Sequence, residues 1–293
     1  MKEPTQITNQ ITKPDCEEIT KSLIKLLSDN TLTKINGQTP LMWLIQQNLE
    51  DSALALIATG KSLPKYLDGY LQTALYMAIN KKMKRVALAL IPVTIGKLQT
   101  ICTLDHYFPK TPLMLACFKA MEDVALALIA TGKSGPEIVS ISGKTPIYYA
   151  CENKLEAVAL ALIATNQSNP ENCTNYGHTA LMSACERGLE NVALALVATS
   201  QSNPDKINNG GLTALIYACQ YKLEKVAMAL LESGKSNYQA KTHSGFDAYH
   251  YAQRNGWTSI CQKIDELKNP KPTPDPKSPP TLTQVPSTDQ STD

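Results

Sequence analysis

Residues 179–212 read TALMSACERGLENVALALVATSQSNPDKINNGGL, and related stretches fill most of the chain. Each opens with Thr, then Pro or Ala, then Leu or Ile, and the six threonines are Thr39, Thr73, Thr111, Thr145, Thr179 and Thr213. Successive threonines lie 34, 38, 34, 34 and 34 residues apart, and a degenerate seventh copy begins at Asp247. Such a unit cannot bury its apolar face alone and must stack on its neighbours. The sequence therefore predicts one array rather than separate globular domains.

Each unit contains two apolar segments. Leu181, Ala184 and Cys185 have helical spacing, which predicts a first helix (helix A) of about nine residues with Thr179 as its N-cap. Residues 192–198, VALALVA, alternate as a strand would, but alanine favours helices and is rare in strands, so we predict a second helix (helix B). Helix B should stop at a residue that is mostly Gly or Asn, which tolerate a left-handed C-cap: Gly60, Gly132, Asn166, Ser200 and Gly234.

The motif Gly-x-Thr-Pro/Ala-Leu, an alanine five residues after the threonine, an apolar second helix and a glycine-type cap resemble the ankyrin repeat. The resemblance covers 37–267 and implies an all-α ankyrin-repeat solenoid of about seven repeats, with paired antiparallel helices and β-turn connections. The period of 34 exceeds the usual ~33 by one residue. Tetratricopeptide repeats share the 34-residue period, but the long Asn-rich stretch at 165–178, interrupted by Pro170, disfavours them.

Composition divides the chain into four segments. Residues 1–14 are polar, and we predict that they are disordered. Residues 15–36 should form an N-terminal capping helix and a first turn, because Asp15 and Glu18 make a capping-box pattern. The solenoid follows at 37–268. Residues 269–293, rich in Pro, Ser and Thr, are predicted to be a disordered Pro-rich C-terminal tail.

The second unit departs from the regular pattern. Pro92 falls in the last turn of its helix B, where proline removes a backbone hydrogen bond, so we expect this helix to end early. Four extra residues lengthen the following loop, 93–110, which carries His106, Tyr107 and Phe108. This loop is either a tolerated insertion or a binding loop.

Charge and hydropathy exclude several classes of partner. The chain has 28 Lys and Arg against 26 Asp and Glu, a net charge of +2 that does not favour nucleic acid. It has no secretory signal and no apolar run of the ~20 residues that span a bilayer. We therefore expect an intracellular, cytoplasmic protein with no membrane partner. Its internal duplication resembles ankyrin arrays of large DNA viruses and intracellular bacteria, for which the location would be the host cytoplasm.

Four of the eight cysteines occupy one equivalent position in successive units: Cys117, Cys151, Cys185 and Cys219. Equivalent positions on stacked helices lie roughly 8–10 Å apart, whereas a disulfide requires Cα atoms within about 7 Å. For the same reason they cannot converge on one metal ion. We interpret them as small apolar residues of the core.

The motifs that resemble chemical sites have simpler explanations. ATGKS at 58–62 and 130–134 resembles the end of a phosphate-binding loop, but it ends a helix and lacks the upstream glycine. Cys173 and His178 match no zinc spacing. The basic run at 81–85 fits a nuclear-localisation pattern but lies in a turn, where charges are ordinarily solvated. We expect no catalytic residue, no cofactor and no metal.

The resemblance implies a protein-binding surface on the concave side of the array. Contacts in the family come from the residue before each threonine, from the turn tips and from positions just after the helix A alanine. The corresponding residues here are Lys110, Phe118, Lys119, Lys144, Asn175, Tyr176, His178, Arg187, Asn209, Leu212, Tyr221 and Phe246. The predicted function is non-enzymatic protein-protein interaction. The alternative is an adaptor in which the array holds a client and the Pro-rich tail recruits other machinery.

Helix B has an apolar residue where the resemblance implies a charged, solvent-facing one. We call these six residues the helix B ridge: Leu54, Leu88, Leu126, Leu160, Leu194 and Met228. An exposed ridge would support weak self-association, since contiguous apolar patches usually mark contacts. Alternatively, each helix is rotated slightly, so that the ridge packs between repeats and alanine faces water.

The predicted tail provides a first test. We expect deletion of 269–293 to leave the melting temperature unchanged, because a segment that buries no surface does not stabilise the folded state. Calorimetry of the full-length and shortened proteins measures the difference. A fall of several degrees in the shortened protein would show that the tail docks on the array.

Overall fold

The computed structural model describes residues 38–68, 72–94, 110–199 and 201–269, together with Glu18, Lys21 and Ser22. These last three residues are helical. The rest of the predicted capping region at 15–36, residues 1–14, almost all of the 93–110 loop and the tail beyond Asn269 lie outside the described residues.

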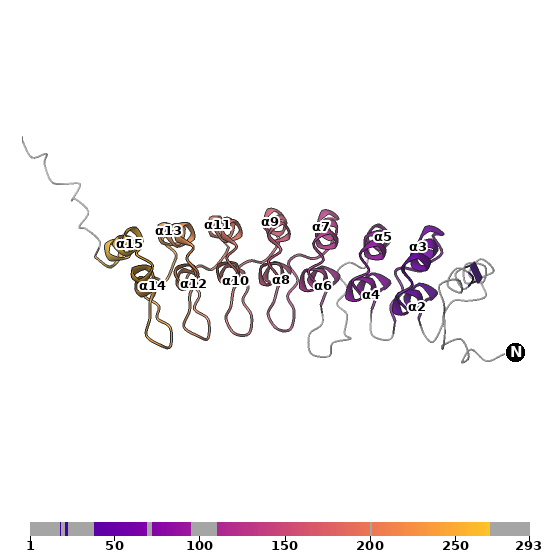
Figure 1. The fold of residues 1–293 in the computed structure, drawn as a ribbon, viewed down its shortest axis with the longest axis horizontal. Coiled ribbons are helices and arrows are strands. Elements are labelled where there is room, and N and C mark those ends of the chain that lie inside the picture. The colour runs from indigo at the N-terminus through magenta and orange to yellow at the C-terminus, as the bar shows by residue number, and fades with distance from the viewer. Residues whose placement is uncertain are drawn as a thin grey trace, which may run out of the picture.

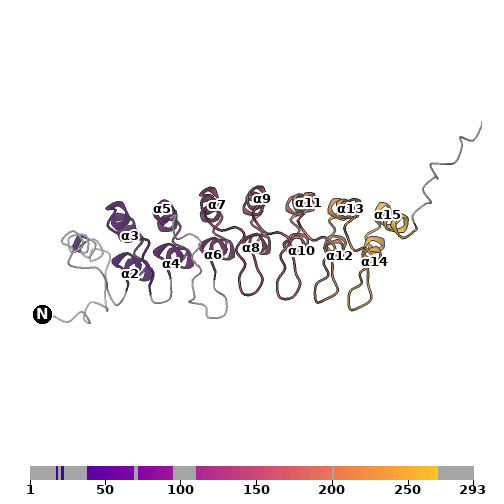
Figure 2. The ribbon, with the colours of Figure 1, turned by 180° about the vertical axis from the view of Figure 1, so that it is seen from behind.

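The helices form two parallel rows, one of A helices and one of B helices (Figure 1). The A helices are α2 (Pro40–Gln46), α4 (Ala74–Asn80), α6 (Pro112–Phe118), α8 (Pro146–Glu152), α10 (Ala180–Glu186), α12 (Ala214–Gln220) and α14 (Ala248–Arg254). The B helices are α3 (Glu50–Ala58), α5 (Lys84–Thr94), α7 (Glu122–Ala130), α9 (Glu156–Ala164), α11 (Glu190–Ala198), α13 (Glu224–Glu232) and α15 (Thr258–Lys268). Each helix packs on its antiparallel partner and on its equivalent in the next repeat. Figure 2 shows the same single file from behind.

The threonine at the start of each unit determines where helix A begins. The Thr179 hydroxyl accepts a hydrogen bond from the Met182 backbone N–H at 3.2 Å, and the other five threonines do the same three residues on. Asp247 replaces threonine in the last repeat, and its carboxylate accepts from the His250 N–H at 2.9 Å. The predicted N-caps are confirmed. Helix A is seven residues long rather than about nine.

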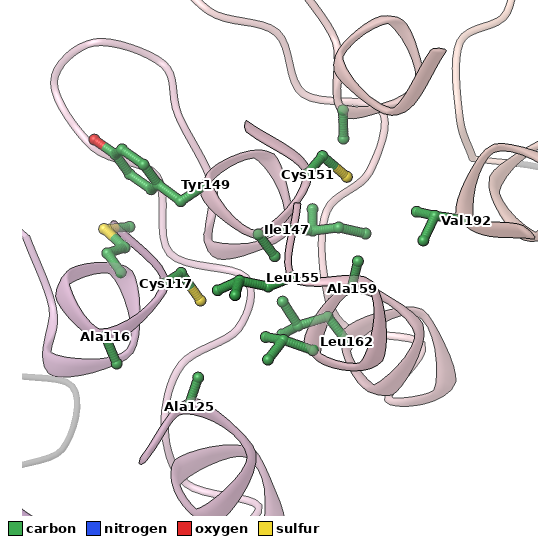
Figure 3. Packing of buried hydrophobic residues seen from close by; sticks show 14 of the residues in the cluster. Ala116, Cys117, Ala125, Ile147, Tyr149, Cys151, Leu155, Ala159, Leu162 and Val192 are labelled. Atoms are coloured by element: carbon green, nitrogen blue, oxygen red, sulfur yellow. The ribbon is translucent and has the colours of Figure 1, made fainter. Parts of the chain in front are cut away.

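A continuous apolar layer between the two rows forms the core. In the repeat that opens at Thr179, Leu181, Val192 and Leu196 are fully buried, and their equivalents are buried along the array except for Tyr249 in the last repeat, which is half-buried. Figure 3 shows Cys117 and Cys151 among these side chains. The four equivalent cysteines have free, fully buried thiols, which confirms their predicted role in the core. Burial raises the pKa of the Cys151 thiol to about 12, so this thiol stays neutral.

Helix B ends as predicted in four of the five expected units. Gly60, Gly132, Asn166 and Gly234 all have positive φ, and Ser200 lies outside the described residues. In the two ATGKS stretches, the threonine hydroxyl donates to a carbonyl of the last helical turn, as from Thr131 to Leu128 at 2.6 Å. These stretches are therefore helix ends, as predicted from the sequence.

The prediction that helix B of the second repeat ends early is wrong. Helix α5 continues through Pro92 to Thr94. Proline removes only one hydrogen bond near the end of a helix, and here the buried Thr94 hydroxyl donates to the Leu90 carbonyl at 2.7 Å. Burial of Ile91 and Thr94 also holds the last turn in place.

Hairpins project from the row of A helices and stack on one another (Figure 1). The four hairpins within residues 138–247 are each closed by a backbone bond, as from the Thr174 N–H to the His178 carbonyl at 3.0 Å. Successive hairpins are also joined, because the Asn175 N–H donates to Ser142 and the Asn209 N–H donates to Tyr176. These bonds hold the hairpin tips in fixed positions relative to one another.

Two glycines separate the effect of turn geometry from that of hairpin stacking. Both Gly143 and Gly245 have positive φ, but only Gly143 faces a following hairpin, where a Cβ would lie 2.5 Å from the Cys173 carbonyl oxygen. Gly245→Ala should lower the free energy of unfolding by about 1–2 kcal/mol through backbone strain alone. Gly143→Ala should lower it by about 1–3 kcal/mol more, because the hairpins must move apart.

Urea denaturation of the two variants and the wild type measures both losses. Equal losses for Gly143→Ala and Gly245→Ala would contradict tight stacking of the hairpins.

Candidate functional site

Exposed large hydrophobic side chains gather on one side of the array. We call the surface formed by the A helices and the projecting hairpins the hairpin face. Of the nine such side chains among the described residues, seven belong to the hairpins or to the C-terminal ends of A helices: Phe118, Val139, Ile141, Tyr176, Ile207, Tyr221 and Phe246. The most exposed are Tyr176, at 75%, and Ile141, at 67%, both at hairpin tips. Isolated exposed apolar residues are ordinary, but a concentration on one face indicates a contact surface.

The predicted contact residues occupy different environments on this face. Exposed side chains belong to Phe118, Asn175, Tyr176, Arg187, Asn209, Tyr221 and Phe246. Half-buried side chains belong to Lys119, Lys144, His178 and Leu212. Lys110 is 4% exposed, and its ammonium lies 4.9 Å from the Phe118 ring centroid. Lys110 therefore positions Phe118 and offers little surface of its own.

A row of aromatic rings crosses four repeats of the hairpin face. We call it the aromatic row, and its members are Phe118, Tyr149, Tyr148, His178, Tyr217 and Tyr221. The rings of Tyr148 and His178 meet edge to face with centroids 5.9 Å apart, and those of His178 and Tyr217 meet likewise at 5.3 Å. The Lys144 ammonium joins Tyr148 and Tyr149, at 4.9 and 5.3 Å from their centroids. Phe246 lies apart from the row and stacks on His250 at 4.2 Å.

Sequence reasoning missed half of this row. Tyr148 lies on helix A at a position where other repeats have Met, Tyr, Ile or His, and Tyr149 and Tyr217 lie at the next position, where other repeats have Trp, Met, Leu, Ser or Tyr. The recurrence of aromatic residues at these two positions of helix A was the available signal. The spacing within a single unit could not show that Tyr148 and Tyr217 contact His178, the residue before the threonine of the repeat between them.

Two carboxylates lie beside the aromatic row at equivalent positions in successive repeats. Glu152 accepts from the Lys144 ammonium at 2.8 and 2.9 Å. Among the described residues, the ionic neighbour of Glu186 is His178, with 4.0 Å between Glu186 Oε2 and His178 Nε2. Burial lowers the pKa of His178, although Glu186 and Glu152 oppose this shift. His178 is therefore neutral near pH 7 and does not balance the charge of Glu186.

A hydroxyl, an imidazole and a carboxylate lie next to one another in space, and they belong to Tyr148, His178 and Glu186. The Tyr148 hydroxyl lies 3.5 Å from His178 Nδ1. Burial, and then the nearby carboxylates, raise the pKa of the Tyr148 phenol far above its ordinary value, so the phenol remains protonated and is a poor nucleophile. The cluster is suited to hydrogen bonding and to attraction of cations.

The other candidate sites contain no ligand set. Within the described ranges, no three His, Cys, Asp or Glu side chains converge as metal ligands would. The basic run at 81–85 makes contacts between repeats, because Lys84 pairs with Asp123 and Arg85 pairs with Asp51. None of the helices in the described part of the chain has both the length and the apolar composition needed to cross a membrane.

The burial of the helix B ridge is intermediate between the exposed ridge and the buried ridge that the sequence left as alternatives. All six of its residues are half-buried and pack against the core. The surface around them is still apolar, because Ile129 is half-buried and Ala130, Ala164 and Ala198 are exposed at the ends of their helices. Charged side chains of α7, α9 and α11 are confined to the first turn.

The comparisons with known proteins agree with the repeat geometry. The family model described as ankyrin repeats (3 copies) matches residues 113–205 and 154–242. The crystal structure of the ankyrin repeat domain of Bcl-3, described as a unique member of the IkappaB protein family, is similar with a TM-score of 0.56. The two chains are 18% identical over 79% of this chain and 100% of that chain, so the likeness concerns the fold. No curated protein matches. The chain is an ankyrin-repeat protein, as its sequence predicted.

Proposed function

We propose that this protein is a non-enzymatic interaction module that binds a protein partner along its hairpin face. The observation that supports this proposal is the concentration of exposed hydrophobic side chains on that face. Aromatic side chains and arginine supply most of the binding energy at protein interfaces, and Tyr176, Arg187 and Tyr221 are exposed there. The proposed surface corresponds to the concave side implied by the family resemblance.

Rigid hairpins favour this function. The bonds between successive hairpins fix the positions of Asn175, Tyr176 and Asn209 before a partner arrives. A surface that is already ordered loses less conformational entropy on binding. We place this activity in the cytoplasm, where the free thiols of the described cysteines would stay reduced.

The proposal is tested by affinity capture and mass spectrometry with a variant of the hairpin face. Four exposed residues are changed together to alanine: Tyr176, Arg187, Asn209 and Tyr221. We expect loss of the specific partner with an unchanged circular dichroism spectrum, because these side chains contribute contacts rather than core packing. Capture with the tail-deleted protein separates this proposal from the adaptor alternative, in which a distinct set of partners disappears with the tail.

A matched control changes four exposed residues on the helix B side to alanine: Glu122, Lys133, Gln167 and Lys235. This control should retain the partner. If the hairpin-face variant captures the partner as the wild type does, or if only the control loses the partner, the binding surface lies on the other side of the array.

We also propose weak self-association through the helix B ridge, with a second copy of this chain as the occupant. The ridge recurs once per repeat, and another copy presents apolar side chains with the same spacing. The apolar surroundings of the ridge on α7, α9 and α11 support this contact.

Sedimentation velocity over a range of concentrations tests the second proposal. We expect the wild type to associate reversibly at high concentration and Leu126, Leu160 and Leu194 changed together to Glu to remain monomeric, since buried carboxylates are costly. These leucines also touch the core, so a second variant changes exposed residues: Ala130, Ala164 and Ala198 to Lys. Lysine suits a helix C-terminus and should preserve the fold while preventing association. A monomeric wild type at high concentration would exclude the contact.

A further inference from the structure

Two successive repeats carry the same carboxylate with different partners. Lys144 and His178 are equivalent residues that precede the threonine, and Glu152 and Glu186 are equivalent residues at the end of helix A. In one repeat the Lys144 ammonium contacts both oxygens of Glu152. In the next repeat a neutral imidazole occupies the place of that ammonium. Glu186 therefore lacks the cation that its counterpart has.

The surroundings of Glu186 resemble those of Lys144, a cation that the protein holds between aromatic rings and a carboxylate. Lys144 lies over the faces of Tyr148 and Tyr149 while it contacts Glu152. Around Glu186, the rings of His178, Tyr217 and Tyr221 continue the aromatic row, with Tyr217 and Tyr221 stacked at 6.2 Å. An aromatic face and a carboxylate together attract an ammonium or guanidinium group.

The Glu186 carboxylate is accessible to a partner. Its side chain is 33% exposed, while that of the neighbouring His178 is 13% exposed. Arg187 is the adjacent residue on the chain, but the ion pair of Glu186 in the described part of the chain is with His178, because neighbouring residues of a helix point in different directions. Burial raises the pKa values of Tyr148 and Tyr217, and Glu186 raises both further, which places its carboxylate close to the two rings.

We propose that Glu186, with Tyr217 and His178, binds a lysine or arginine side chain of the protein partner. The partner's cation would take the place that Lys144 occupies one repeat earlier. This inference rests on the proposed function of the hairpin face and adds the chemical class of the residue recognised there. General attraction of cations would not explain such binding, since the chain has a net charge of +2.

The test is an NMR titration of the full-length, ¹⁵N-labelled protein with three probes. These are the N-acetyl methylamides of lysine, arginine and citrulline, the last being a neutral analogue of arginine. We expect one or both cationic probes to shift the backbone signals of Glu186 and His178, and citrulline to leave them unchanged. The stronger of the two cations identifies the preferred residue.

Two variants and a control localise the site. Glu186→Gln removes the charge, and His178→Lys supplies an internal cation in the arrangement already present at Lys144. Each should weaken binding of the effective probe by about tenfold or more. Glu232→Gln removes an exposed carboxylate of α13 and should leave binding unchanged. The dispersion of each spectrum shows that the variant is folded.

The inference fails if neither cation shifts these signals, if citrulline shifts them equally, or if both variants bind the cation as the wild type does. The proposed function is assessed separately by partner capture. Capture that is lost in the four-residue hairpin-face variant but retained in Glu186→Gln and His178→Lys would leave the binding surface in place and overturn only the cation site.

Discussion

Each repeat of this protein buries its apolar side chains only against its own two helices and the neighbouring repeats. The seven-residue A helices are too short to be stable alone, so the stacking of one repeat on the next supplies most of their stability. This constraint explains why Leu181, Val192 and Leu196 recur as buried residues at nearly every step. It also explains the cysteines, because a small apolar side chain suits the narrow space between adjacent A helices.

The same constraint leaves one surface free to vary. Residues at the base of each hairpin and at the end of helix A contact one another at the edge of the apolar core, and they change from repeat to repeat. The exchange of Lys144 for His178 is such a change. In one repeat it yields a closed ion pair, and in the next it leaves Glu186 beside a neutral ring. A single substitution within a repeated framework thus converts an internal contact into a surface able to bind a charged group.

Hairpin stacking connects this variation to function. Backbone bonds between successive hairpins hold Asn175 and Asn209 in register, and Gly143 permits the close approach that those bonds require. The surface is therefore rigid although it is built from turns. Rigid presentation of exposed aromatic residues suits recognition of a protein partner better than chemistry on a small substrate, for which the raised pKa of Tyr148 provides no reactive group.

The sequence by itself determined the repeat, the ankyrin family, the start of each A helix and the burial of the cysteines. These features depend on local interactions or on periodicity, as when Thr179 accepts a bond from the N–H three residues on. Only the tertiary structure decided that α5 continues past Pro92, that the helix B ridge is half-buried, and that Tyr148, His178 and Tyr217 meet across three repeats. The physical reason is that these outcomes depend on how far each repeat is rotated and shifted against the next, and no single unit of the sequence encodes that relation.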